Sequence, residues 1–333
     1  MSSELDQQAM RDARLAMLAA LVGGDISLAF RLTTDLLSQG IPFDAIVVDL
    51  LGPVQEELGR KWAAGDLGIA DEHAASSGVD ELLVRLGAIA EVPSGPTVVV
   101  ASAEYDAHAL GGRVVASALS LEGFRVLFLG ASVPARDLAD FLELHQPLAL
   151  ALSCSIPTAL VGVAGSVAAA HDLGVPVVGG GRALAREERA VRLGVDAFAR
   201  VPHDAVEILQ AWELSPPDHL APAPEPIPEH TMLARQSPML ISAALEVRSN
   251  EDLAGRGLAE ELGRVLQVVE GALLIAETDL IHEHVHWLRE TGPAHGLTRA
   301  GIDDALAALA DAMDVDLPRA AAALRETLTR AHG

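Results

Sequence analysis

The feature that most constrains the fold is a series of short apolar, β-branched runs separated by helix-like stretches in the middle of the chain. The runs lie at 97–101, 125–129, 148–152 and 175–178. Strand–helix alternation with uninterrupted apolar strands is typical of a parallel sheet whose two faces are covered by helices. Residues 95–213 are therefore predicted to form a doubly wound, Rossmann-like α/β domain.

The segment before this domain has a helical pattern. Apolar residues recur at helical spacing from Met10 to Leu21, and glycines at Gly23 and Gly40 end the first two helices. A third helix is expected from residue 43 to about 64 and a fourth from 68 to 87. Four helices with short connections predict an antiparallel bundle that caps the α/β domain, over residues 1–92.

The segment after the α/β domain is rich in proline. Residues 214–238 contain seven prolines, and proline is excluded from helix interiors and central strands, so an extended, semi-rigid linker is expected. Residues 239–333 return to helical periodicity and predict an all-helical domain of five or six helices. Asn250, followed by two acidic residues, and Thr298 are the expected N-caps.

Charge and cysteine content narrow the classes of partner. The net charge of −24 repels phosphate backbones and anionic lipid headgroups, so neither DNA nor a membrane is expected as a partner. Cys154 is the only cysteine, so no internal disulfide can form, which fits a cytoplasmic protein. The longest uncharged stretch, 147–170, is interrupted by polar residues and glycines and predicts a buried strand, a loop and a helix.

The first chemical motif follows the first predicted strand. Asp106, His108 and Gly111 spell D-x-H-x-x-G in a loop at the carboxyl end of the sheet, where open α/β domains bind ligands. The imidazole can offer one nitrogen to a metal while Asp106 accepts the other ring N–H. Gly111 would let the next helix approach a bulky ligand. A lone histidine would be read as an ordinary loop residue, but the three residues together favour a metal ligand.

Over residues 95–200 the chain resembles the cobalamin-binding domain family of methionine synthase, corrinoid methyltransferases, adenosylcobalamin mutases and cobalamin photoreceptors. The resemblance implies that His108 replaces dimethylbenzimidazole as the lower axial ligand of cobalt. It also implies that the freed nucleotide tail enters a pocket lined by a serine after a later strand and by a glycine pair. The matching residues, which follow the third and fourth predicted strands, are Ser153, Ser155, Gly179, Gly180 and Gly181. The family commonly has Leu or Thr where Ser155 stands, which leaves the role of this serine open.

The glycine run alone predicts only a tight turn. Glycine-rich loops also cradle nucleotide phosphates, but this run follows a late strand and does not fit the dinucleotide-binding fingerprint.

The second motif lies in the helical N-terminal part, where Trp62, Glu72 and His73 spell W-x9-E-H. A short turn brings the three residues to one end of the bundle. Without further context, Trp62 would be interpreted as a core aromatic residue and Glu72 as an acidic residue at a helix N-terminus. The pattern resembles the cap of adenosylcobalamin-dependent photoreceptor repressors, which implies that Trp62 covers the upper axial ligand and Glu72 binds the adenosyl ribose.

Two departures from those repressors matter. They carry a histidine directly after the tryptophan, which binds cobalt after photolysis, whereas this chain has Ala63. A two-histidine product through this position is therefore excluded, and His73 is the nearest spare imidazole. The repressors also carry a basic DNA-binding domain, which this acidic chain lacks.

The C-terminal part contains an unusual polar run that matches H-E-x-x-H, with His282, Glu283 and His286. A zinc protease is disfavoured because Arg289 stands where the extended motif has glycine and no third ligand is evident. A solvated helix face is an equally good interpretation.

The layout of cap, cobalamin domain, linker and helical domain resembles the photocobilins, whose C-terminal globin-like domain binds a bilin such as biliverdin. With no cysteine in residues 239–333, a bilin would be held non-covalently. The candidate residues for its propionates and pyrroles are Arg248, His282, His286 and Arg289.

Together these patterns favour a light sensor rather than an enzyme. Adenosylcobalamin would lie between the cap and the α/β domain, and cobalt–carbon photolysis would shift the cap and signal to a protein effector or through self-association. The main alternative is a corrinoid methyl carrier of a methyltransferase system. A third reading is a nucleotide- or metabolite-binding regulator without cobalamin. No catalytic nucleophile or acid–base pair is identified.

Overall fold

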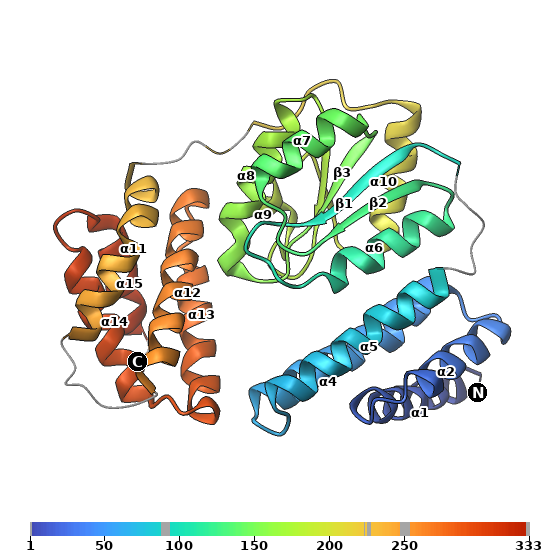
Figure 1. The fold of residues 1–333 in the computed structure, drawn as a ribbon, viewed down its shortest axis with the longest axis horizontal. Helices are drawn as coiled ribbons and strands as arrows, with labels where there is room; N and C mark the ends of the chain where they lie inside the picture. Colours follow the sequence, from blue (N-terminus) through green and yellow to red (C-terminus); the bar gives the residue numbers. More distant parts are fainter. Residues whose placement is uncertain (1, 88–93, 223, 225–227, 247–253, 331–333) are drawn as a thin grey trace.

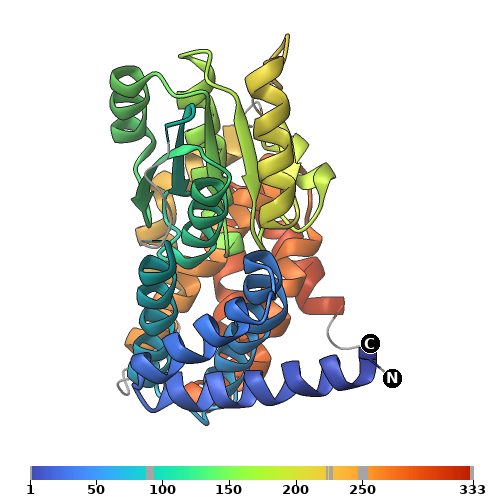
Figure 2. The ribbon, with the colours of Figure 1, turned by 90° about the vertical axis from the view of Figure 1, so that its right-hand side faces the viewer.

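The computed structural model describes residues 2–87, 94–222, 224, 228–246 and 254–330 of the chain. Figure 1 shows three bodies: the helical N-terminal part, a central α/β part and a helical C-terminal part. Figure 2, turned by 90°, places the N-terminal helices below the α/β part. The predicted succession of a helical cap, a doubly wound domain and a C-terminal helical region is confirmed.

The N-terminal cap forms the helices that the periodicity predicts. They are α1 (Ser2–Val22), α2 (Ile26–Ser38), α3 (Phe43–Ala45), the π-helix η1 (Ile46–Leu51), α4 (Gly52–Ala63) and α5 (Ile69–Gly87). The third predicted helix therefore contains a wide π segment just before Pro53, whose ring removes a backbone donor at the start of α4. Met17, Leu50, Leu58 and Leu82 are fully buried in the cap core.

The central sheet has five parallel strands in the order β2-β1-β3-β4-β5. They are β1 (Thr97–Ser102), β2 (Arg125–Gly130), β3 (Ala149–Ser153), β4 (Val177–Gly180) and β5 (Ala197–Ala199). The chain moves from β1 to one side and then to the other, so the carboxyl ends of β1 and β3 flank the topological switch point. The short fifth strand is absent from the sequence-based prediction.

Helices cover both faces of the sheet. They are α6 (Leu110–Leu121), α7 (Ala135–His145), α8 (Leu160–His171), α9 (Glu187–Arg192) and α10 (Pro202–Leu214). Val98 and Val100 pack in one core with α6 and α10, whereas Val99 and Ala101 pack in the other with α7 and α8. This alternation is what the period of two along a strand requires, and it makes β1 apolar on both faces.

The C-terminal region is helical: α11 (Pro228–Glu246), α12 (Ala254–Ile275), α13 (Asp279–Thr291), the 3-10 helix η3 (Gly292–His295), α14 (Arg299–Met313) and α15 (Pro318–Arg330). The Thr298 hydroxyl accepts from the backbone N–H of Gly301 at 3.1 Å, so the predicted N-cap is confirmed. The other expected N-cap, Asn250, lies outside the described residues. A globin-like arrangement stays a prediction.

The proline-rich segment ends earlier than expected. The linker was predicted to continue to residue 238, but α11 begins at Pro228 and contains Pro238 in its interior. Pro228 is tolerated because the first turn of a helix needs no backbone donor. Around Pro238 the Ser237 hydroxyl donates to the Leu233 carbonyl at 2.8 Å and the Ser242 hydroxyl to the Pro238 carbonyl at 3.0 Å. These bonds add side-chain donors to helix carbonyls on both sides of the interruption.

The C-terminal region is docked on the α/β domain through α12. A Cβ at Gly271 on α12 would lie 3.3 Å from the Cβ of Leu160, the first residue of α8, so α12 and α8 approach closely at this point. At the end of α12 the Glu277 carboxylate pairs with Arg189 at 2.6 Å and with Arg186 at 2.5 Å. No helix in the described part of the chain is long and apolar enough to cross a membrane.

Candidate functional site

The loop after β1 is organised by one buried carboxylate. Asp106 is fully buried, and its Oδ1 accepts the backbone N–H of His108 at 2.9 Å and lies 2.8 Å from His108 Nδ1. Its Oδ2 accepts the backbone N–H of Ser155 at 2.5 Å. Asp106 therefore ties the β1 loop to the β3 loop and orients the imidazole at the same time. The predicted Asp106–His108 pair is present in the structure.

The orientation of His108 suits a metal ligand. With Nδ1 bonded to Asp106, Nε2 is the nitrogen that can carry the free lone pair, and the side chain is 59% exposed. The Asp106 hydrogen bond raises the pKa of His108 above its ordinary value, against the opposing effect of burial. A carboxylate-supported imidazole is a stronger electron donor toward a metal.

Gly111 allows the first turn of α6 to approach β3. A Cβ at this position would lie 2.9 Å from Ser153 Oγ and 4.0 Å from Ser155 Oγ. The D-x-H-x-x-G motif and the two serines, far apart in the sequence, thus meet at one edge of the sheet. Ser102 is the last residue of β1, and its hydroxyl donates a hydrogen bond to the His108 carbonyl at 3.1 Å. This bond connects the loop to the end of the strand.

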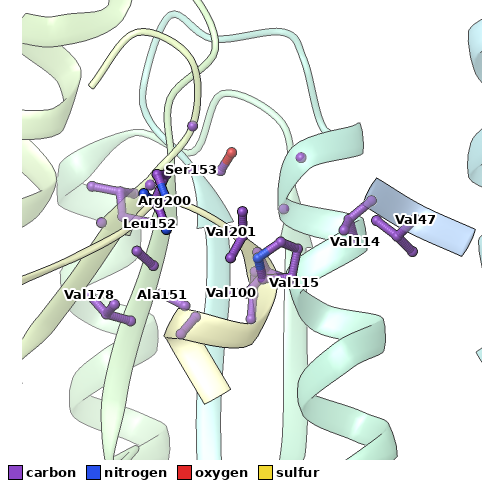
Figure 3. Close-up of a pocket in the computed structure, with 18 residues that line it drawn as sticks. Val47, Val100, Val114, Val115, Ala151, Leu152, Ser153, Val178, Arg200 and Val201 are labelled. Carbon is purple, nitrogen blue, oxygen red and sulfur yellow. The ribbon is translucent and has the colours of Figure 1, made fainter. Parts of the chain in front are cut away.

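A cavity of about 230 Å³ opens beside these residues. Figure 3 shows it between the strands that carry Val100 and Ala151 and the helix that carries Val114 and Val115. Its walls are mostly valine, alanine and glycine, with Ser153 and Arg200 as polar residues. An apolar slot with few polar groups suits a flat aromatic ring system attached to a polar tail. Sequence reasoning missed Arg200, because it follows the unpredicted strand β5.

The glycines take a different position from the one expected. They were predicted to follow the fourth strand, but Gly179 and Gly180 lie within β4, paired with both β3 and β5. A Cβ at Gly180 would lie 2.6 Å from the Ala199 carbonyl oxygen, and one at Gly179 would lie 2.8 Å from Val195 Cγ1. Close approach of the chain around β5 therefore requires them. All three, including Gly181, line the cavity as predicted.

In the cap, Glu72 and His73 begin α5 and contact each other. Glu72 Oε2 lies 2.7 Å from His73 Nδ1, and Glu72 Oε1 accepts from the Ser76 hydroxyl at 2.7 Å. The negative charge of Glu72 also helps to raise the pKa of His108. His73 itself is exposed.

Trp62, at the end of α4, is half-buried and makes its aromatic contacts with the C-terminal region. Its ring stacks on His295 with a centroid distance of 4.8 Å and on Trp287 at 6.3 Å. The sequence pattern placed Trp62 at the cap end near Glu72 but did not indicate these C-terminal partners.

Three of the four bilin candidates, His282, His286 and Arg289, lie on α13. His286 is exposed and faces Glu290 at 3.4 Å. Arg289 donates its Nε to Asp303 at 2.7 Å, while its Nη2 and His282 Nδ1 are buried without a hydrogen-bond partner. Arg248 lies outside the described residues. Within the described residues, no group of three or more His, Cys, Asp or Glu side chains could hold a metal ion.

His284, also on α13, is not among the residues predicted to bind a bilin. Burial lowers its pKa to about 4, and its Nε2 has no hydrogen-bond partner.

Known proteins match the cap and the α/β domain. Residues 96–209 match a family described as "B12 binding domain", and residues 14–86 match a second family with the same description. The trimethylamine corrinoid protein of Methanosarcina barkeri is 26% identical over 202 residues, which cover 58% of this chain and 92% of that protein. The transcriptional repressor CarH of Myxococcus xanthus is 31% identical over 155 residues, covering 45% of this chain and 52% of the repressor.

A solved structure supports the fold. The monomethylamine corrinoid protein of Methanosarcina barkeri superposes with a TM-score of 0.51 at 19% identity, covering 61% of this chain and 99% of that protein. At this identity the likeness shows the shared fold of cap and sheet domain.

The residues present fit a corrinoid. The Asp106-supported imidazole projects at the edge of the sheet, and Gly111 keeps the space beside Ser153 open where any side chain would close it. The neighbouring cavity is apolar and of a size for one ring system. Residues 14–86 and 96–209 match B12-binding domain families, and this match supports cobalamin as the ligand of the protein.

Proposed function

We propose that the protein is a light sensor that holds adenosylcobalamin between the cap and the sheet domain, with His108 as the lower axial ligand. The observation that carries the binding mode is the buried Asp106, which presents His108 beside the glycine-lined cavity. The nucleotide tail of the cofactor would occupy this cavity, next to Ser153 and the backbone of Gly179–Gly181. The Ser155 hydroxyl lies 4.0 Å from where a Cβ on Gly111 would be, so Ser155 would border the entrance of this cavity.

The cap supports the adenosyl form of the cofactor. Trp62 at the end of α4 and Glu72 in the first turn of α5 lie at the same end of the cap, and a carboxylate there can accept hydrogen bonds from a ribose. When bound, the cofactor supplies a cobalt–carbon bond that visible light can break. Trp62 and Glu72 would lose contacts when the adenosyl group leaves, and this differential interaction is what a conformational signal requires. The signal would reach a protein effector or alter self-association.

The absorption spectrum of the protein loaded with adenosylcobalamin, before and after green light, tests this proposal. A light-dependent change that Trp62→Ala or Glu72→Ala makes smaller or abolishes is expected. A spectrum that green light leaves unchanged would contradict the light-sensing role while leaving cobalamin binding intact. Size-exclusion chromatography of the same samples reports whether self-association changes.

The second candidate function is a corrinoid methyl carrier. It is favoured by the match to the trimethylamine corrinoid protein, which covers 92% of that relative. A carrier needs an upper face that a methyltransferase can reach, whereas a light sensor needs a pocket for the adenosyl group. Affinities for methylcobalamin and adenosylcobalamin discriminate between them. Tighter binding of adenosylcobalamin, weakened by Trp62→Ala, supports the sensor.

A bilin such as biliverdin is the proposed second chromophore, held non-covalently in the C-terminal region. Two buried nitrogens there, His282 Nδ1 and Arg289 Nη2, have no hydrogen-bond partner and could serve a ligand's carboxylates or pyrroles. Added biliverdin should give a red-shifted absorption band that is lost on denaturation in acid. Arg289→Ala should weaken this band, whereas Glu290→Ala, at an exposed position on the same helix, should not.

A further inference from the structure

An aromatic contact joins the cap to the C-terminal region. The Trp62 ring lies 4.8 Å from the His295 ring at an interplanar angle of 28°, and 6.3 Å from the Trp287 ring at 25°. Trp287 in turn stacks on His284 at 5.6 Å. These separations fall in the range in which aromatic pairs contribute beyond their buried area. The last residues of α4 are therefore held by η3 and α13.

The backbone of the turn after α4 also approaches the C-terminal region. A Cβ at Gly65, just after α4, would lie 3.4 Å from Ala294 Cβ, so the turn that ends α4 contacts η3 directly. The contact thus involves the turn after Trp62 as well as the Trp62 side chain.

The other side of the C-terminal region is fixed to the cobalamin domain. The Glu277 carboxylate, mostly buried at the end of α12, pairs with the buried Arg189 and with Arg186. Gly271 on the same helix packs against Leu160 at the start of α8. The C-terminal region consequently touches both halves of the cobalamin site, the sheet domain through α12 and the cap through η3 and α13.

We propose that Trp287 and His295 are positioning residues for the upper side of the cobalamin site, through which the C-terminal region holds the Trp62 end of the cap in place. The inference rests on the proposed role of Trp62 as the cover of the upper axial ligand. A cap fixed in this way favours a cofactor with a bulky upper group, because Trp62 is already held where that group must pack. A small upper ligand gains nothing from the same contact.

The test compares adenosylcobalamin with hydroxocobalamin, which lacks a bulky upper group, in the full chain. Trp287→Ala and His295→Ala should weaken adenosylcobalamin by about threefold to tenfold and change hydroxocobalamin affinity by less than about twofold. Trp287→Phe should restore most of the loss. Glu290→Ala is the matched control, since it changes an exposed residue on the same helix that has no part in the stack.

Hydrogen exchange gives a readout that does not depend on the cofactor's spectrum. In the cofactor-loaded protein, amides at 61–65 should exchange faster in Trp287→Ala than in the wild type, whereas those of β1 should not change. Equal weakening of both cobalamins, or wild-type affinities in Trp287→Ala and His295→Ala, would overturn the proposal.

A further variant separates this proposal from the one on which it rests. If Trp62→Ala binds adenosylcobalamin as tightly as the wild type, Trp62 does not cover the upper ligand and both ideas fail. If Trp62→Ala weakens adenosylcobalamin and Trp287→Ala does not, only the role of the C-terminal region fails.

Discussion

Asp106 has a role at the site that its neighbours cannot share. Its two oxygens engage the His108 backbone, the His108 ring and the Ser155 backbone, and none of its surface is exposed. A fully buried carboxylate is stable only when its oxygens are paired, and here the pairing also aligns the imidazole. The order of His108 and of the loop that carries Ser155 therefore depends on one side chain.

His108→Ala should remove the spectral signature of histidine-ligated cobalamin, because the loop between β1 and α6 contains no other histidine. Asp106→Ala should keep the histidine but lower cobalamin affinity by roughly 10- to 100-fold, the effect typical of losing a carboxylate that orients a metal-binding histidine. Absorption titration with hydroxocobalamin measures both changes. The exposed Asp172 serves as a control for Asp106. Wild-type affinity in Asp106→Ala would argue against its orienting role.

At the scale of elements, the cavity exists because β4 ends in glycines. Gly181 has a φ of +105°, and a Cβ there would lie 2.4 Å from the Cys154 carbonyl oxygen. The turn after β4 is thereby pressed against the loop after β3, which also supplies Ser155, while Ser153 is the last residue of β3 itself. Backbone conformation and close packing both select glycine at this position.

Gly181→Ala is expected to lower the free energy of unfolding by about 3 kcal/mol, because backbone strain adds to a clash with main-chain atoms. Gly174→Ala is the matched control: it has a φ of +71° but nothing within 4 Å of its would-be Cβ. Strain alone should cost it about 1 kcal/mol. Urea denaturation measures both, and equal losses would show that the contact with Cys154 contributes nothing.

The helix α12 carries a carboxyl group whose burial is unfavourable. Burial raises the pKa of Glu270 to about 7 and lowers the pKa of His230, whose Nε2 lies 3.3 Å away. Because the folded-state pKa of this acid exceeds the unfolded value, the group ionises first in the unfolded chain, and the free energy of unfolding falls as pH rises from about 4.5 to about 7.

Glu270→Gln should therefore raise the free energy of unfolding at pH 8, by about 2 kcal/mol, and change it little at pH 5. Urea denaturation at the two pH values measures the difference. Glu290→Gln, at an exposed position on α13, should show no such pH dependence. A loss of stability at pH 8 would indicate instead that Glu270 and His230 form a favourable ion pair.

At the scale of the whole molecule, the C-terminal region and the α/β domain are joined by a partly buried ion pair. Arg189 donates to Glu277 and to the Ala183 carbonyl, and both side chains are shielded, with 4% and 11% of their surface exposed. A buried guanidinium that loses its carboxylate has no water to replace it. The docking of the two bodies therefore depends on this contact more than on the exposed pairs elsewhere.

Glu277→Ala should destabilise the protein by about 3 kcal/mol, since it leaves Arg189 buried and unpaired. Asp279→Ala is the control: Asp279 lies two residues after Glu277 and pairs with Arg330 at the surface. This change should lower the free energy of unfolding by less than about 1 kcal/mol. Thermal denaturation monitored by circular dichroism compares the two variants. Similar effects would show that the Glu277 pair is not sheltered from solvent.

Local patterns were enough to predict the helical cap, four of the five strands, the D-x-H-x-x-G loop and the Thr298 N-cap. Each depends on the residue types within one strand, one turn or one helix, where apolar periodicity and capping act directly. The family match to a B12-binding domain agrees with the chemistry inferred from Asp106 and His108. Two errors also have local causes: β5 is only three residues long, and α11 tolerates Pro238 against its intrinsic preference.

Contacts between distant segments needed the folded chain. Apolar spacing says which face of a helix is buried but not which body covers it, because that depends on surfaces that exist only after each part has folded. Hence the backbone bond from Ser155 to Asp106, the entry of Arg200 into the cavity wall and the stacking of Trp62 on Trp287 and His295 were decided by tertiary packing. The D-x-H-x-x-G pattern of the β1 loop is a local property of the sequence, whereas the shape of the space around it is a property of the whole molecule.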